Sequence, residues 1–211
     1  QSKFGGASVL FDGSGDYVRF ADSDNWYFAN DDFTIDLWMR VTSATAAGTL
    51  FDHSQDPTNG PYFNLSKLSG TLYLYWYYAG TNCNYNTNAV SWSANTWHHI
   101  AMVRHNGTVT FYVDGTSVGS TSGCPNYNDT STFELGGSGY NADFAGWIDE
   151  FRVSKGIARW TSNFTPPTGE YGPDGRITTF LTSGTTWTVP SDWNSSRNTI
   201  EVIGGGGGGG G

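Results

Sequence analysis

Two dipeptides, Asn106-Gly107 and Asp114-Gly115, interrupt a stretch of β-branched and aromatic residues. Asparagine or aspartate before glycine supplies the positive φ angles of a type I′ turn, which joins neighbouring antiparallel strands. The stretch therefore predicts a three-stranded meander. We expect its strands over Trp97–Arg104, Thr108–Val113 and Thr116–Ser120.

A second constraint is the strict alternation of the segment Phe33–Val41. Alternate side chains of an extended strand point to opposite faces of its sheet. One face is apolar and is expected to meet a core; it carries Phe33, Ile35, Leu37, Met39 and Val41. The opposite face carries Thr34, Asp36, Trp38 and Arg40.

A hairpin is predicted from Tyr62–Lys67 and Thr71–Tyr78, which flank Ser69-Gly70. Its second strand also alternates. The face expected to be core carries Leu72, Leu74 and Trp76, and the other face carries Tyr73, Tyr75 and Tyr77. In the meander, Phe111 and Val113 are expected to join the same core.

Four more short strands are expected, over Ser8–Phe11, Asp16–Phe20, Phe133–Leu135 and Gly146–Val153. An Asp-Gly-Ser-Gly turn lets the second of them return alongside the first. Only Lys155–Ser162 is suited to a helical turn. Because 16% of residues are aromatic, 14% are charged and 29 are glycine, the composition favours strands and turns over helices. The predicted fold class is all-β, a two-sheet antiparallel jelly-roll sandwich.

The composition changes near residue 166, where prolines and glycines accumulate. We expect a jelly roll over residues 1–168, a linker over 169–175, and a short β-like piece over 176–211 that runs into polyglycine. The chain ends in eight glycines, Gly204–Gly211. They are either a flexible tail or the start of a glycine-rich module, and the strand-like Thr199–Ile203 before them favours the module. Because the chain opens at Gln1, we also expect sequence upstream of it.

The charge balance excludes some partners. Ten Lys and Arg against 19 Asp and Glu give a net charge of −9, and no basic cluster is present. A duplex nucleic acid binder must neutralise phosphates, so nucleic acid is not expected as a partner. Insertion into a membrane is not expected either, because no apolar run reaches the roughly 20 residues of a span.

Five segments, in this order, resemble the laminin-G-like, concanavalin-A-like jelly-roll domains: Ser8–Val18, Phe33–Met39, Trp97–Ala101, Phe111–Gly115 and Gly146–Val153. The resemblance covers roughly residues 4–168. It implies the fold, but the fold hosts lectins, adhesins, pentraxins and glucanases alike.

A second resemblance concerns phage structural proteins. Thr186–Pro190 and Ile200–Gly204, followed by polyglycine, look like the start of glycine-rich regions in phage tail and fibre proteins. Ala158-Arg159 followed by Phe164–Pro167 also resembles the versions of this jelly roll that such proteins carry.

Catalysis is not expected. The β-glucanases of this fold use a Glu-x-Asp-x-Glu triplet that places paired acids on one strand face, and the sequence contains no such triplet. Asp149 and Glu150 are adjacent, so they point to opposite faces of a strand. We therefore expect a protein that is not an enzyme.

The aromatic surplus indicates a glycan site. Flat rings beside polar groups suit sugars, whose C–H faces stack on rings while their hydroxyls form hydrogen bonds. The candidate residues are Asp36, Trp38, Arg40, Tyr73, Tyr75 and Tyr77, with Asn64 and Ser66 beside them. They form one face only if their strands share a sheet orientation. The alternative is that the tyrosines merely cover a sheet.

Two groups of acidic residues are candidates for binding Ca²⁺. In related jelly rolls an aspartate at the position of Asp149 binds a structural Ca²⁺ together with groups near the N-terminal strand, here around Asp12. The alternative for Asp149 is a strand-end carboxylate paired with a backbone N–H or an arginine. A rim loop with Asp52, His53 and Asp56 is a second candidate for Ca²⁺, and a solvated polar loop is its alternative.

The chain has two cysteines, Cys83 and Cys124, whose spacing fits no metal site. They form either one disulfide or two free thiols. A disulfide would tie together two loops rich in tyrosine and asparagine, Asn82–Asn88 and Asn126–Asn128.

These observations predict a non-catalytic, lectin-like module on the surface of a phage virion, as part of a tail fibre or a decoration. Its expected partners are host glycans and other virion proteins, and its expected location is extracellular. One alternative is a secreted or surface-anchored bacterial carbohydrate-binding domain, and another is a purely structural virion module. Self-association into a homo-oligomer stays open.

Overall fold

The computed structural model describes residues 1–54, 61–137 and 142–171. All of them belong to one compact unit, Gln1–Phe180, whereas the second unit, Leu181–Gly211, lies outside the described residues, as does most of the expected linker. None of the helical segments in the described ranges has the length and hydropathy of a membrane span.

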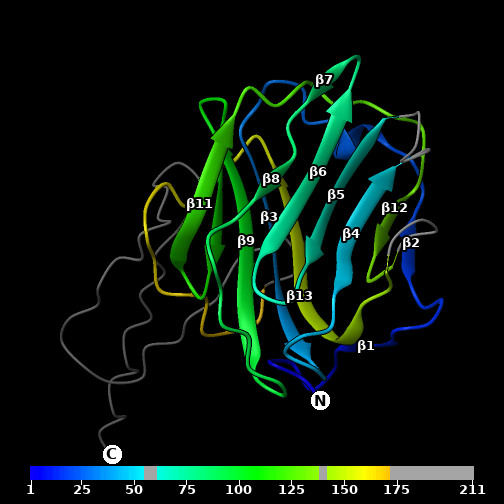
Figure 1. The fold of residues 1–211 in the computed structure, drawn as a ribbon, viewed down its shortest axis with the longest axis vertical. Coiled ribbons are helices and arrows are strands. Elements are labelled where there is room, and N and C mark those ends of the chain that lie inside the picture. Colours follow the sequence, from blue (N-terminus) through cyan, green and yellow to red (C-terminus); the bar gives the residue numbers. More distant parts are fainter. Residues whose placement is uncertain (55–60, 138–141, 172–211) are drawn as a thin grey trace, which may run out of the picture. The chain divides into compact units, whose positions relative to one another are not determined.

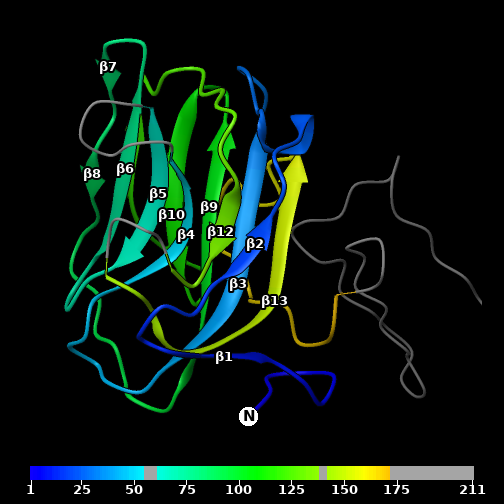
Figure 2. The same cartoon turned by 90° about the vertical axis from the view of Figure 1, so that its right-hand side faces the viewer.

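Two antiparallel sheets form the jelly-roll sandwich that the sequence predicts. Sheet A has the order β1 (Val9–Asp12), β13 (Ala145–Lys155), β3 (Phe33–Val41), β9 (Trp97–His105), β10 (Thr108–Val113) and β11 (Thr116–Ser122). Sheet B has the order β2 (Val18–Phe20), β12 (Phe133–Leu135), β4 (Gly48–Ser54), β5 (Tyr62–Lys67), β6 (Leu72–Tyr78) and β7 (Thr81–Asn82), with β8 (Tyr85–Asn86) also paired to β6. In Figure 1, β4, β5 and β6 lie in front of β3 and β13, and Figure 2 shows β5 and β6 at the opposite side from β13.

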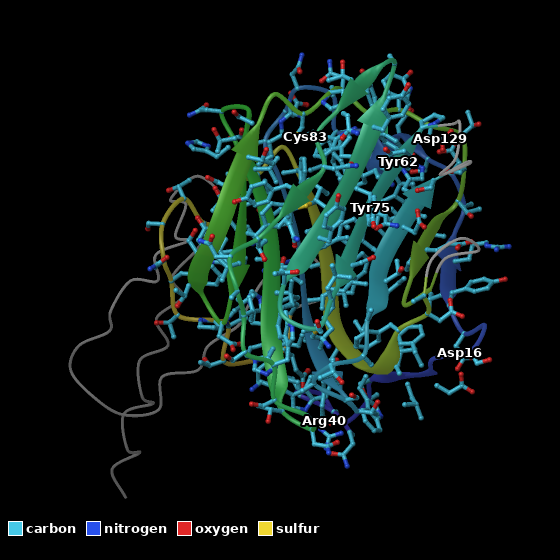
Figure 3. All side chains as sticks on the ribbon, in the orientation of Figure 1. Asp16, Arg40, Tyr62, Tyr75, Cys83 and Asp129 are labelled. Atoms are coloured by element: carbon cyan, nitrogen blue, oxygen red, sulfur yellow. A yellow bond between two sulfur atoms is a disulfide. The ribbon has the colours of Figure 1, made fainter. Side chains whose placement is uncertain are left out.

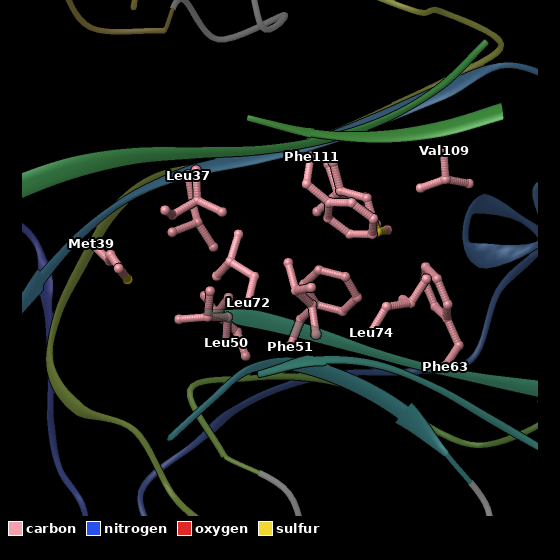
Figure 4. Packing of buried hydrophobic residues seen from close by; sticks show 14 of the residues in the cluster. Leu37, Met39, Leu50, Phe51, Phe63, Leu72, Leu74, Val109 and Phe111 are labelled. Carbon is pink, nitrogen blue, oxygen red and sulfur yellow. The ribbon is translucent and has the colours of Figure 1, made fainter. Parts of the chain in front are cut away.

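The core lies between the sheets, where the alternation placed it. Figure 4 shows Leu37 and Phe111 of sheet A meeting Leu72 and Leu74 of sheet B. Each of the seven residues predicted to be core is at most 7% exposed: Phe33, Ile35, Leu37, Leu72, Leu74, Phe111 and Val113. The predicted inward faces of these strands are therefore confirmed.

The meander turns are as predicted. Asn106 and Gly107 have φ angles of 48° and 78°, and Asp114 and Gly115 have 49° and 75°. Positive φ at both central residues is the type I′ geometry. Gly115 has a second role, because a Cβ atom there would lie 1.9 Å from the carbonyl oxygen of Phe164. Glycine thus lets the segment after β13 lie close against this turn.

Three expectations differ from the structure. Strands β1 and β2 do not pair across their turn, because β1 pairs with β13 in sheet A and β2 with β12 in sheet B. Residues 155–162 form no helical turn. Gly156 turns the chain with a φ of 74°. The Thr34 hydroxyl then donates a hydrogen bond to the carbonyl of Ile157 at 2.9 Å. The one helical turn among the described residues is η1 (Asp24–Trp26), which the Ser23 side chain caps.

Candidate functional site

Four tyrosines meet on the outer face of sheet B, and we call them the tyrosine face: Tyr62 of β5 and Tyr73, Tyr75 and Tyr77 of β6. The register pairs Tyr62 with Tyr77, so both lie on the same side of the sheet. Their rings stack with centroids 5.4 Å apart, and the rings of Tyr73 and Tyr75 are 4.2 Å apart. All four side chains are partly exposed. Figure 3 shows Tyr62 and Tyr75 side by side on this face.

A row of polar side chains runs across β4 and β5 on the same face of sheet B. Asn64 pairs with Tyr75 and Ser66 with Tyr73 in the strand register. The Asn64 amide donates to Asp52 Oδ2 at 3.4 Å, the Ser66 hydroxyl donates to Asn64 Oδ1 at 3.2 Å, and Ser66 Oγ lies 3.4 Å from Thr49 Oγ1. This polar row comprises Thr49, Asp52, Asn64 and Ser66, and all four are buried.

At the β12 side of the same face, Arg19 of β2 and Glu134 of β12 form an ion pair with an N–O distance of 2.8 Å. Burial raises the pKa of the Tyr73 hydroxyl, and the neighbouring Tyr75 and Tyr62 raise it further. The raised pKa favours the uncharged phenol of Tyr73, a neutral ring with a hydroxyl group.

The other three predicted ligand residues do not join this face. Asp36, Trp38 and Arg40 lie on β3, which belongs to sheet A, whereas the tyrosines lie on sheet B. The expectation of one six-residue face is therefore wrong, because each set points outward from a different sheet. In Figure 3 the Arg40 label lies at the bottom of the view, away from Tyr62 and Tyr75.

Asp36 is fully buried at the centre of an ionic cluster on the outer face of sheet A. Arg152 donates to both of its oxygens, through Nε to Oδ1 and through a terminal nitrogen to Oδ2, each at 2.9 Å. The Tyr171 hydroxyl donates to Oδ2 at 2.5 Å, and His99 Nε2 lies 3.4 Å from the same atom. Burial alone would raise the pKa of Asp36, but hydrogen bonding to His99 and the charge of Arg152 outweigh it and lower the pKa.

Two segments cover this face of sheet A. The first is the C-terminal strap, residues 156–171, whose Trp160 and Phe164 rings stack with centroids 4.0 Å apart. Trp160 packs with Ala101 and Tyr112 in a second small hydrophobic cluster. The strap therefore converts the outer face of β9 and β10 into a buried layer. Tyr171, which we expected in a linker, instead joins the ionic cluster.

The second covering segment is the N-terminal arm, residues 1–8. The Lys3 ammonium lies 4.0 Å from the centroid of Trp38, and the Phe4 ring packs edge-on against Trp38 with centroids 5.9 Å apart. Trp38 is consequently only 5% exposed. Arg40 remains partly exposed, but it stacks over Trp147 and donates to the Asn95 carbonyl at 3.1 Å.

Asp149 anchors the N-terminal arm. Its Oδ2 accepts the backbone N–H groups of Lys3 and Phe4 at 2.7 and 3.2 Å, and its Oδ1 accepts the N–H of Glu150 at 2.9 Å. These contacts match the alternative interpretation of Asp149, a strand-end carboxylate paired with backbone N–H groups, and the Ca²⁺ role stays a prediction. Asp12 binds its own turn, because its Oδ1 accepts the N–H of Ser14.

The predicted rim cluster is also divided. Asp52 and His53 are consecutive residues of β4 rather than of a loop, so they point to opposite faces. Asp52 joins the polar row, whereas the His53 ring packs edge-on against Tyr127. Asp56 lies outside the described residues. Within the described ranges, no three His, Cys, Asp or Glu side chains are arranged to hold a metal ion.

A histidine–aspartate pair on sheet A raises the question of acid–base chemistry. His98 Nδ1 lies 2.7 Å from Asp114 Oδ2, and the Ser93 N–H donates to His98 Nε2 at 3.3 Å. The second nitrogen is therefore occupied by a backbone group and cannot accept a proton from a nucleophile. Both ring nitrogens of His98 are therefore engaged in hydrogen bonds within the fold.

Cys83 and Cys124 form a disulfide with Cα atoms 4.9 Å apart. The bond joins the residue after β7 of sheet B to a segment that follows β11 of sheet A. It therefore connects the two sheets at one end of the sandwich, between the loops that the sequence singled out.

Sequence reasoning found the three β6 tyrosines but missed several of their neighbours. Tyr62, Thr49 and Asn86 lie on the same face because of the register of β4, β5, β6 and β8. The alternation of Tyr62, Asn64 and Ser66 along one predicted strand was the available signal for Tyr62. No comparable sequence pattern marked strands β4 and β8.

Comparison with known proteins agrees with this architecture. Residues 12–159 match Laminin_G_3, described as the Concanavalin A-like lectin/glucanases superfamily. No curated protein matches the chain.

Three solved structures are similar in fold. The carbohydrate-binding module CBM40 of the Ruminococcus gnavus IT-sialidase, bound to α2,3-sialyllactose, is 14% identical with a TM-score of 0.58 over 73% of this chain and 92% of that chain. Domain 4 of the extracellular arabinanase AbnA of Geobacillus stearothermophilus, in complex with arabinotriose, is 22% identical with a TM-score of 0.53 over 72% and 77%. Domains LG4-5 of the mouse laminin α1 chain are 20% identical with a TM-score of 0.54 over 70% of this chain but only 40% of that chain.

Proposed function

The chain belongs to the Laminin_G_3 family of the concanavalin A-like lectin/glucanases superfamily, and from this premise we propose that it is a non-catalytic carbohydrate-binding module. The proposed ligand site is the tyrosine face of sheet B. The observation that carries the proposal is the contact of four partly exposed tyrosine rings, Tyr62, Tyr73, Tyr75 and Tyr77, on one open sheet face.

The chemistry of this face suits a sugar. Apolar C–H faces of a pyranose ring stack on aromatic rings, and each phenolic hydroxyl both donates and accepts a hydrogen bond. The rings already contact one another, so less side-chain entropy is lost when a ligand binds than with isolated side chains. Two solved structures of this fold contain bound saccharides, sialyllactose and arabinotriose, which supports the same role here.

The absence of hydrolysis is part of the proposal. His98 is bound at both nitrogens, and Asp36 is sealed beneath the C-terminal strap with Arg152 on both oxygens. Neither group faces the tyrosine face. A bound glycan is therefore expected to leave the protein unchanged.

We further propose that the module works outside the cell on a phage virion, as part of a tail fibre or decoration that adheres to host glycans. The support is the resemblance of the glycine-rich C-terminal sequence to phage fibre proteins. A secreted bacterial carbohydrate-binding domain would need the same tyrosine face. Immunogold labelling of purified virions distinguishes the two settings, because only the first places the protein on the particle.

The binding proposal is tested with the full chain on a glycan array, followed by titration of the glycans that bind. Tyr75→Ala is expected to weaken binding several-fold, because an aromatic contact is worth about 1 kcal/mol beyond its buried area. Tyr27→Ala is the matched control, since Tyr27 is a partly exposed tyrosine outside the tyrosine face. Binding that EDTA abolishes and Tyr75→Ala leaves intact would contradict the site, and release of reducing sugar would contradict the absence of catalysis.

A further inference from the structure

Few charged side chains lie around the tyrosine face in the part of sheet B that the structure describes. On the described outer surface of sheet B the register places two carboxylates, Asp52 and Glu134, and one cation, Arg19. Glu134 already holds Arg19, with Glu134 Oε1 2.9 Å from Nε and 2.8 Å from a terminal nitrogen. The described part of the face therefore holds no cation beside the tyrosines that a ligand carboxylate could pair with.

Resting on the proposed function, we infer that the tyrosine face selects neutral glycans and rejects anionic ones. The ligand class is a saccharide without carboxylate, sulfate or phosphate groups at the units that contact Tyr62, Tyr73, Tyr75 and Tyr77.

The physical reason is desolvation. An anionic sugar that stacks on the rings loses part of its hydration, and it recovers that energy only from a cation or from several aligned N–H donors. Phenolic hydroxyls each supply one neutral donor, which satisfies sugar hydroxyls but does not balance a charge. The net charge of −9 adds repulsion, which disfavours an anionic ligand at low ionic strength.

One exposed neighbour of the rings is a neutral amide. Asn86 of β8 pairs with Tyr73 in the strand register, so its amide lies on the same face, and it is exposed. An amide donates to and accepts from sugar hydroxyls without selecting for charge. Asn86 is thus a position at which one substitution changes the charge of the face without touching the buried polar row.

The experiment compares neutral and acidic members of matched pairs, with methyl-esterified and free polygalacturonate, and lactose and sialyllactose, as probes beside the array. The full chain is expected to bind the neutral member of a bound pair at least ten-fold more tightly, a difference of about 1.4 kcal/mol. Binding of the neutral member should change little between about 50 and 500 mM NaCl, because no ion pair is screened.

Asn86→Lys supplies the missing cation, and Asn86→Gln is its matched control. The lysine variant is expected to bind the acidic member several-fold more tightly at low salt, with this gain lost at high salt. The glutamine variant should keep the preference for the neutral member.

The outcomes separate the two proposals. Tighter binding of acidic members by the unaltered chain overturns the neutral-ligand inference and leaves the carbohydrate-binding proposal standing. Neutral binding that Tyr75→Ala does not weaken overturns the inference as a property of the tyrosine face. Absence of binding to every glycan, neutral and acidic, overturns the proposed function and the inference together.

Discussion

The outer faces of the two sheets carry similar residues but differ in their exposure to solvent. On sheet A, Trp38 and Asp36 alternate along β3 and are buried, whereas on sheet B the tyrosines of β6 alternate in the same way and stay partly exposed. The difference is the cover: the C-terminal strap and the N-terminal arm pack on sheet A. An aromatic and polar strand face is therefore either a ligand surface or a second buried layer, and the segment that packs on it decides which.

The cover also explains why sheet A tolerates a buried charge. Asp36 keeps its charge because Arg152 binds both of its oxygens and Tyr171 of the strap donates a third hydrogen bond. The Arg19–Glu134 pair of sheet B is the exposed counterpart, with an Arg19 side chain that is 50% exposed. An arginine–carboxylate ion pair thus occurs on both outer faces, buried on sheet A and exposed to water on sheet B.

The largest effect is expected from Asp36→Ala. Removing the carboxylate takes away the acceptor of two Arg152 hydrogen bonds in a buried site, which costs roughly 3–5 kcal/mol of unfolding free energy. Glu134→Gln, at the exposed pair, should cost at most about 1 kcal/mol. Urea denaturation of both variants measures the contrast, and equal losses would show that the strap does not isolate Asp36 from water.

Loss of the disulfide should rank next, because it joins the two sheets. Closing the loop between Cys83 and Cys124 is worth about 3–4 kcal/mol in the chain-entropy account. The double variant Cys83→Ser with Cys124→Ser should therefore lower the denaturation midpoint. Mass spectrometry without reductant checks the bond itself. Alkylation of both thiols under those conditions would refute the pairing.

Leu37→Ala tests the layer that the two faces share. Leu37 follows Asp36 on β3 but points inward and is 1% exposed, so its truncation should cost roughly 2–5 kcal/mol through lost burial and the cavity left behind. The loss is measured by thermal or urea unfolding. A loss no larger than that of Tyr75→Ala would mean that the core is less tightly packed than its burial indicates.

Acid should weaken sheet A through two aspartates. Burial raises the pKa of Asp36 and of Asp114, but hydrogen bonds to His99 and to His98 respectively outweigh it, so both pKa values lie below normal. A folded-state pKa below the unfolded value of about 4 gives stability at neutral pH that is lost as the pH falls below about 4. Unfolding free energies measured from pH 7 to pH 3 should decline in this window, and Asp114→Asn should flatten the decline.

The smallest effect on stability is expected from Tyr75→Ala. Its ring is partly exposed on the open face, so we expect a loss of about 1 kcal/mol or less, beside a several-fold loss of glycan binding. Parallel unfolding and binding measurements separate the two quantities. A large destabilisation would instead assign the tyrosine face to the architecture of sheet B.

Much of the fold followed from local patterns. The strands Phe33–Val41, Tyr62–Lys67 and Thr108–Val113 have the predicted bounds, because alternation and turn residues act over a few positions. The candidate site was only half predicted. Tyr73, Tyr75 and Tyr77 do share one open face, but Asp36 and Trp38 were assigned to it although they belong to the other sheet.

The sequence by itself determined which residues are extended, where the chain turns and which side of each strand is apolar. These properties depend on neighbours a few residues apart. Only the tertiary structure decided which sheet each strand joins and which outer face stays open. Those outcomes depend on contacts between distant residues, such as Asp36 with Arg152 and Lys3 with Asp149. Because such contacts leave no periodic pattern along the chain, no local pattern distinguished the covered face of sheet A from the open face of sheet B.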